Sequence, residues 1–351
     1  MGALGGHDQS LLPCQSCLIL TSLMDGSRNS SLCFPNHNSS CRRLLLPLSE
    51  TGLFHTLLTL ISLLTVMLNL LVIISISHFR QLHNPTNSLL LSLAVSDLAV
   101  GLLVMPIEGL RYLETCWLLG RLMCALTPYV FYSLTSASLG HMVLISVDRY
   151  VAICDPLLYP TRITMINVKI CVSLCWVCSL VYNGLILMGH LGQPDRFSTC
   201  HGECVVIVSR VSGTVDLFIS FIAPFTVMVV LYFRVLLAAL SQVRLIRSQT
   251  AATAVKSAQA VTRSEWKAAR SLAIVIVVFI MCYCPYFYPS FDGTDTSSSL
   301  SYFAALSWIL MLNSSMNPII YVLFYPWFRK AIKLILTLKI LQPDSCDMKM
   351  M

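Results

Sequence analysis

Residues 53–78 read LFHTLLTLISLLTVMLNLLVIISISH, a stretch that contains no Asp, Glu, Lys or Arg. An α-helix rises about 1.5 Å per residue, so about 20 apolar residues cross the roughly 30 Å hydrocarbon core of a bilayer. This stretch is long enough to do so. Six more apolar runs follow, near 86–108, 121–148, 169–190, 211–238, 268–290 and 299–323. The pattern predicts an all-α membrane protein, a bundle of seven transmembrane helices.

The overall composition agrees with a membrane protein. Of the 351 residues, 56% are hydrophobic and only 11% are charged, whereas soluble domains carry about 25% charged residues. The sequence has no internal repeat of the kind that builds many transporters. It also lacks the nucleophile motifs and metal-ligand spacings that are typical of enzymes. A receptor is therefore a better interpretation than a transporter, a channel or an enzyme.

The distribution of basic residues predicts the orientation in the membrane. With the N-terminus outside, the outside segments hold seven of the 23 Lys and Arg residues and the inside segments hold the other 16. Lys and Arg favour the cytoplasmic side, so we expect this orientation. The net charge of +7 then reflects contact with anionic membrane lipid rather than with nucleic acid. The apolar residues 11–24 lack a preceding basic region, so we expect no signal peptide there.

The chain divides into three regions. Residues 1–52 form an N-terminal segment that we expect to be extracellular and glycosylated, because Asn29 and Asn38 each begin an Asn-x-Ser acceptor sequence. Residues 53–325 form the seven-helix domain. Residues 326–351 form a cytoplasmic tail that starts with PWFRKAIKLIL. This pattern predicts a short amphipathic helix that lies on membrane lipid after the seventh span.

Asp97 lies in the middle of a predicted span, where a carboxylate calls for a cation or a proton. Several side chains with oxygen atoms are predicted at a similar depth, and oxygen ligands suit a hard cation. The candidate site for an allosteric sodium ion comprises Asp97, Ser138, Asn313, Ser314 and Asn317. For the asparagines, the alternative is hydrogen bonding between helices.

Asp216 is a second acid inside a predicted span. It precedes Pro224 by eight residues, which places it about 12 Å nearer the outside. No Lys or Arg is predicted at that depth to neutralise it. Two interpretations remain open: a buried acid that stays protonated, and a counter-ion for a cationic ligand. We favour the counter-ion.

Aromatic side chains are predicted at the same depth as Asp216. They are Phe131, Tyr132, Tyr283, Tyr286, Phe287 and Trp308. Aromatic rings can surround an ammonium group and stabilise it by cation–π contact. Each ring alone more often fills the core of a helix bundle, but their coincidence with an unpaired acid favours an amine site.

Glu108 follows Asp97 by 11 residues, close to three helical turns, so it should face the interior nearer the outside. We hypothesise that Glu108 holds the second amine of a diamine. The alternative is a hydrated side chain at the end of the helix.

The positions of three cysteines predict a disulfide on the outside. Cys124 lies at the outer end of the third span, and Cys200 and Cys204 lie in the loop before the fifth. A disulfide from Cys124 to this loop would hold the loop over the bundle. The spacing alone does not assign the pairing.

One residue in each predicted span resembles a landmark of the rhodopsin-like G-protein-coupled receptors. The matching residues are Asn69, Asp97, Arg149 of Asp148-Arg149-Tyr150, Trp176, Pro224, Pro285, and Pro318 of Asn317-Pro318-Ile319-Ile320-Tyr321. The resemblance covers roughly 53–338. Seven landmarks in order are far more specific than any one of them.

A narrower resemblance lies at the end of the seventh span. Residues 313–328 read NSSMNPIIYVLFYPWF, which is similar to the signature of the trace amine-associated receptors at every specified position. That family implies a small amine ligand, a role in olfaction and a Cys124–Cys204 disulfide. It also implies a disulfide from Cys200 to the N-terminal segment, with Cys41 the first choice and Cys33 the second.

Departures from the family pattern point to Asp216. Amine receptors usually carry an aspartate in the third helix, where this chain has Phe131, and a tyrosine in the seventh, where it has Met311. This chain resembles a subset of fish members that holds the amine from the fifth helix. Tyr283 replaces the tryptophan of the usual activation switch. The predicted ligand site comprises Asp216, Phe131, Tyr132, Glu108, Tyr283, Tyr286, Phe287, Ser307, Trp308 and Met311.

The same resemblance assigns residues to signalling. Arg149 and Glu265 match an inactive-state ion pair, although a solvated acid at a helix end explains Glu265 equally well. The set for activation and G-protein coupling is Asp148, Arg149, Tyr150, Pro156, Leu157, Tyr232, Glu265, Asn317, Pro318 and Tyr321. The family implies stimulatory or olfactory G proteins, which raise cAMP. We predict a plasma-membrane receptor for amines; the alternative is a receptor of the same fold for a non-amine or a conventional monoamine ligand.

Overall fold

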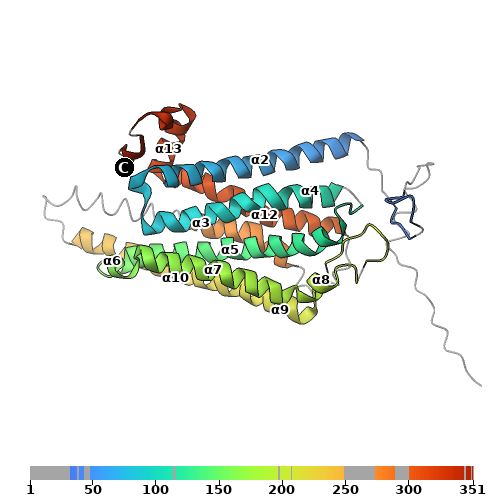
Figure 1. Cartoon of the computed structure of the whole chain (residues 1–351). Helices are drawn as coiled ribbons and strands as arrows, with labels where there is room; N and C mark the ends of the chain where they lie inside the picture. Colours follow the sequence, from blue (N-terminus) through green and yellow to red (C-terminus); the bar gives the residue numbers. More distant parts are fainter. Residues whose placement is uncertain are drawn as a thin grey trace, which may run out of the picture.

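The computed structural model describes residues 32–37, 39–42, 48–113, 116–196, 198–206, 208–248, 273–288, 300–343, 345–348 and 350. Within these residues, six helices are long and apolar enough to cross a membrane, and a further apolar helix, Ala273–Tyr288, is shorter. The predicted bundle of seven helices is confirmed. The long helices run side by side along one direction (Figure 1).

The spans follow the predicted order closely. They are α2 (Leu48–His78); α3 (Pro85–Ala99) with η2 (Val100–Val104) and α4 (Met105–Leu113); α5 (Gly120–Cys154); α7 (Met165–Ile186); α9 (Arg210–Leu217) with η3 (Phe218–Ile222) and α10 (Ala223–Ser248); Ala273–Tyr288; and α12 (Leu300–Phe324). The third helix runs six residues past the predicted end at 148, so Asp148-Arg149-Tyr150 is helical. The fourth ends at Ile186 and a short helix, α8 (Met188–Gly192), follows it.

Two spans contain a π-helical turn, and each turn ends two residues before a proline. The turn η2 precedes Pro106 and the turn η3 precedes Pro224. Proline lacks an N–H and its ring clashes with the carbonyl four residues earlier. A π-turn widens the helix there and adds one residue, which rotates the preceding side chains by about 100°. In the fifth span this rotation sets the direction of Asp216, just before η3.

Helix α5 lies at the centre of the bundle and packs against α3, α7 and α10 (Figure 1). Its approach to α7 depends on Gly140, because the sulfur of Cys175 occupies the position that a Cβ at Gly140 would take. A larger residue there would push the two helices apart.

Buried polar groups join the helices to one another. The Asn69 amide donates to the carbonyls of Thr65 at 2.9 Å and Ser314 at 3.0 Å, and the Thr65 hydroxyl lies 2.6 Å from that of Ser315. Hydrocarbon offers no hydrogen-bond partner, so such groups must be satisfied inside the protein. These bonds connect α2 to α12.

Three disulfides lie at one end of the bundle, called here the disulfide end. They are Cys33–Cys116, Cys41–Cys200 and Cys124–Cys204. The last two are the pairings that the family resemblance implied. The first is a feature that sequence reasoning misses, because Cys33 and Cys116 come together only when the N-terminal segment folds over the loop between the second and third spans.

The N-terminal segment packs against the loop before the fifth span. The N–H of His201 donates to the carbonyl of Ser39 at 2.7 Å, and that of Cys41 donates to the carbonyl of His201 at 3.0 Å. The rings of Phe34 and His201 lie 4.8 Å apart. Gly202 has a φ of +100°, which favours glycine, and Phe34 covers it. The segment and the loop therefore form one cross-linked cap.

The other end, called here the Arg149 end, carries α6 (Tyr159–Arg162) and α13 (Pro326–Leu336) (Figure 1). Helix α13 buries Trp327, Phe328 and Ala331 and exposes Arg329 and Lys330, so it is amphipathic as predicted. Beyond it come η4 (Lys339–Leu341) and η5 (Ser345–Asp347). This tail returns to the turn after α2, η1 (Arg80–Leu82), where Asp347 and Arg80 form an ion pair at 3.2 Å.

The unexpected disulfide generates a first prediction. Cys33→Ser, Cys116→Ser and the double variant should all lower the melting temperature of the purified receptor by the same amount, because each removes the same bond. Loss of a native disulfide costs about 2–5 kcal/mol. The control is Cys178→Ser, which alters a free, exposed thiol. A double variant clearly less stable than either single variant would contradict the pairing.

Candidate functional site

Asp216 lies half-buried at the disulfide end, on α9. The hydroxyl of Tyr182 on α7 donates to its Oδ1 at 3.0 Å, and the hydroxyl of Ser220 donates to the same oxygen at 2.6 Å. None of the ion pairs among the described residues includes Asp216. Both partners are neutral, so within the described part of the chain the carboxylate has hydrogen-bond donors but no ion-pair partner.

A cavity opens beside Asp216. Its lining comes from α5, the fifth span, Ala273–Tyr288 and α12, and consists of Tyr132, Thr135, Ser136, Leu139, Asp216, Ser220, Tyr283, Tyr286, Phe287 and Leu310. The free volume is about 20 Å³, which is room for about one water molecule. A hydrogen bond of 2.6 Å between the Tyr132 and Tyr286 hydroxyls joins two of its walls. A larger ligand needs a wider cavity, and separation of these two tyrosines would widen it.

Half of the predicted ligand set lines this cavity. Asp216, Tyr132, Tyr283, Tyr286 and Phe287 do so, whereas Phe131, Glu108, Ser307, Trp308 and Met311 do not. Phe131, Trp308 and Met311 are buried in the core instead. They lie on helices that line the cavity, but their side chains fill the space between helices. Sequence reasoning could not predict the direction in which these side chains point around their helix axes.

Stacked rings continue from the cavity toward the bundle centre. The ring of Phe287 lies 5.2 Å from that of Phe221 in η3, Phe221 lies 6.0 Å from Phe279, and Phe279 lies 4.3 Å from Tyr283. Tyr283 and Phe279 are fully buried. The stack connects the π-turn beside Asp216 directly to the helix Ala273–Tyr288.

Glu108 is buried and forms an ion pair. Its side chain is 9% exposed and its Oε1 lies 3.4 Å from Nη1 of Arg111, one turn along α4. The expectation of a hydrated helix-end residue is wrong, because the bundle and the loop above cover this position. The other terminal nitrogen of the Arg111 guanidinium, Nη2, donates to the carbonyl of Cys204 at 2.9 Å.

Asp97 is fully buried and holds two hydrogen bonds between helices. Ser138 on α5 donates to Oδ1 at 3.0 Å, and the Asn317 amide on α12 donates to Oδ2 at 2.8 Å. Asn313 lies one turn before Asn317, and its buried side-chain oxygen has no hydrogen-bond partner among the described atoms. Carboxylate, hydroxyl and amide oxygens form a donor set that fits a hard cation.

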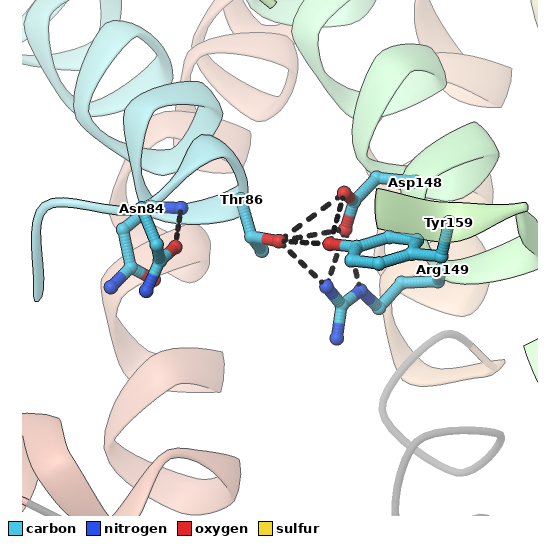
Figure 2. A network of polar contacts seen from close by, with 6 residues as sticks. Asn84, Thr86, Asp148, Arg149 and Tyr159 are labelled. Carbon is cyan, nitrogen blue, oxygen red and sulfur yellow. Dashed lines mark hydrogen bonds and ion pairs between the residues drawn. The ribbon is translucent and has the colours of Figure 1, made fainter. Parts of the chain in front are cut away.

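Asp148 and Arg149 form a compact network at the Arg149 end (Figure 2). They are ion-paired, Arg149 donates to the hydroxyl of Thr86 at 2.9 Å, and that hydroxyl donates to Asp148 at 3.2 Å. Tyr159 on α6 donates to Asp148 at 3.0 Å. Burial raises the pKa of Tyr159 above its usual value, so the phenol stays protonated and keeps donating.

The remaining predicted signalling residues surround this network. Tyr321 is buried, and Tyr321, Asn317 and Arg149 line a second small cavity at this end. Pro318 lies within α12, and Tyr150 and Tyr232 are half-buried. Pro156 is exposed and Leu157 is 91% exposed. Glu265, Asn29 and Asn38 lie outside the described residues.

Several site residues escape sequence reasoning. The sequence does contain a signal for Ser220, because this residue follows Asp216 by one helical turn and so lies on the same face of the helix. Tyr182, Thr86 and Tyr159 reach their partners from other helices, so no local spacing reveals them. The Arg111 pairing with Glu108 is an i,i+3 contact and was also readable from spacing.

Comparison with known proteins agrees with this geometry. Residues 68–321 match the 7 transmembrane receptor (rhodopsin family). The chain is 37% identical to trace amine-associated receptor 13c of Danio rerio over 92% of this chain and 96% of that protein. It is 39% identical to trace amine-associated receptor 7e of Mus musculus over 96% and 97% of the two chains. The chain therefore belongs to the trace amine-associated receptors, a family of rhodopsin-type G-protein-coupled receptors and not of enzymes.

Proposed function

We propose that this receptor binds amines by docking the ligand's ammonium group on Asp216. The observation that supports the proposal is a carboxylate with two hydroxyl donors, no ion-pair partner among the described residues, and a wall of aromatic rings beside it. A carboxylate in such a site gains most from a cation that enters with the ligand. The rings of Tyr286 and Phe287 add cation–π attraction for the same charge.

The hydroxyl partners leave Asp216 able to accept an ammonium. Tyr182 and Ser220 both donate to Oδ1, and no hydrogen bond to Oδ2 occurs among the described contacts. A carboxylate offers about four lone-pair sites. Oδ2 can therefore take the ammonium while Tyr182 and Ser220 keep the side chain in position.

The disulfides support an extracellular disulfide end. Disulfides persist in oxidising compartments, and the three bonds gather at that end with the N-terminal segment. The N-terminus is then outside at the plasma membrane, the side on which the acceptor sequences of Asn29 and Asn38 would be glycosylated. The opposite end places α13 on the inner leaflet, with Arg329 and Lys330 toward anionic lipid.

Ligand binding is linked to signalling through the fifth span. Separation of Tyr132 from Tyr286 and attraction of the ammonium to Asp216 would move η3 and Phe221, which stacks on Phe279 of the next helix. At the inner end, Arg149 is released from Asp148 and Thr86 when a G protein binds beside Leu157. The G protein is of the stimulatory or olfactory type, so the response is a rise in cAMP, and the role is olfactory.

An allosteric sodium ion fits the Asp97 cluster. Asp97, Ser138 and Asn313 supply oxygen ligands, and Asn317 orients the carboxylate. When bound, the ion would neutralise the buried carboxylate and stabilise the closed bundle.

The amine anchor is tested with Asp216→Asn in a cAMP reporter assay against a panel of monoamines, diamines and polyamines. Loss of a buried charge pair costs about 3–5 kcal/mol, so potency should fall at least about 100-fold. The matched control is Asp195→Asn, because Asp195 is an exposed acid paired with Arg121 at the same end.

Two results would contradict the anchor. An Asp216→Asn variant with the parent's potency at equal surface expression makes Asp216 structural. A parent receptor that reaches the surface and answers no amine favours the alternative of a non-amine ligand for the same fold.

The Arg149 network generates a separate prediction. Thr86→Val keeps the shape of the side chain but removes the hydroxyl that bonds both Asp148 and Arg149. Each lost hydrogen bond destabilises the conformation in which Arg149 is bonded to Asp148 and Thr86 by about 1 kcal/mol. The basal cAMP level should therefore rise several-fold. Thr161→Val is the control, because its hydroxyl bonds only the carbonyl of Leu158 among the described contacts. Basal cAMP that stays at the parent level would exclude a restraining role for this network.

A further inference from the structure

The ion pair between Glu108 and Arg111 lies at the disulfide end, with Glu108 buried and Arg111 half-buried. Their side chains are 9% and 19% exposed. The guanidinium is also bound to the carbonyl of Cys204, and Cys204 is fixed to α5 by its disulfide with Cys124. Arg111 is therefore held by Glu108 of the same helix through Nη1 and by the loop through Nη2.

This pair acts on the same tyrosines as Asp216. The Tyr132 hydroxyl interacts electrostatically with three charged side chains: Asp216, Glu108 and Arg111. The hydroxyl of Tyr286, bonded to that of Tyr132, interacts with both Asp216 and Glu108. The tyrosine pair whose separation would widen the cavity thus lies within reach of two carboxylates and one guanidinium.

These three charges leave one negative charge uncompensated. Arg111 neutralises Glu108, whereas the partners of Asp216 among the described residues are only hydroxyl donors. One ammonium group on a ligand would neutralise this remaining negative charge. A second ammonium that extends toward Glu108 would meet the positive charge of Arg111 at short range, and in a buried site this repulsion is only weakly screened.

We propose that Arg111 makes this receptor selective for monoamines. It is ion-paired with Glu108, the carboxylate that a second ammonium group would need. The inference rests on the proposed amine site at Asp216 and defines its ligand class. It replaces the hypothesis that Glu108 receives the second amine of a diamine. Selectivity of this kind comes from a repulsive element placed against the unwanted ligand.

The test compares n-alkylamines with α,ω-diaminoalkanes of the same chain lengths. Two readouts are used: cAMP in cells, and the ligand-induced rise in melting temperature of the purified receptor, which reports binding without the G protein. On the parent, each monoamine should be at least about tenfold more potent than its matched diamine. Arg111→Gln frees Glu108, so it should shift the diamine-to-monoamine potency ratio at least about tenfold toward the diamine.

Two further variants act as controls. Arg111→Lys keeps the positive charge and should keep the monoamine preference. Glu108→Gln leaves Arg111 uncompensated, so it should weaken every amine and the diamines at least as much as the monoamines. If Arg111→Gln does not reach the surface, these two variants decide the question.

The outcomes separate this inference from the proposed function. If the parent answers diamines as well as monoamines and both responses need Asp216, the amine site stands and the selectivity inference fails. The inference also fails if Glu108→Gln abolishes a diamine response while every monoamine keeps the parent's potency, or if Arg111→Gln leaves the ratio unchanged. If no amine stabilises or activates the parent, the proposed function and this inference fail together.

Discussion

The rest of the structure depends on one constraint: hydrocarbon supplies no hydrogen-bond partner, so each polar group in the helices must be satisfied inside the bundle. Asp97 is held by Ser138 and Asn317, and Glu108 is held by Arg111. Asp216, like Asp97, has only neutral partners among the described residues, Tyr182 and Ser220, but it lines the cavity at the disulfide end. A site that is satisfied in hydrogen bonds but not in charge is suited to a ligand that brings a cation.

The sequence predicts the fold well and the contacts between helices poorly, for a physical reason. Apolar runs and the distribution of charges are local patterns in the sequence. They are sufficient to predict the seven spans and the amphipathic helix α13. Expected depth follows from the rise per residue, and Asp216, Tyr286 and Phe287, which were expected at one depth, line the same cavity. The direction in which each side chain points around its helix axis is harder to predict from the sequence. The π-turn η3 rotates the residues before it, and neighbouring helices choose partners such as Tyr182.

The geometry also explains how a pocket without the usual third-helix acid can work. Phe131, at the position of that acid, is buried and contacts Tyr132 with ring centres 5.0 Å apart. The acid that we propose for recognition, Asp216, is instead on the fifth span, next to a π-turn and the Phe221–Phe279–Tyr283 stack. The anchor and the aromatic path to the next helix are thus adjacent. A ligand can shift the receptor only through unequal affinity for its two states, and we propose that this adjacency is where that difference arises.

The most direct test of the central claim is an experimental structure of the receptor with a bound monoamine. The account predicts the ammonium nitrogen at hydrogen-bond distance, about 2.7–3.2 Å, from the Asp216 carboxylate. It also predicts that the Tyr132–Tyr286 hydrogen bond is broken and the Glu108–Arg111 pair is intact. An ammonium bound elsewhere, with Asp216 still held only by Tyr182 and Ser220, would contradict the account.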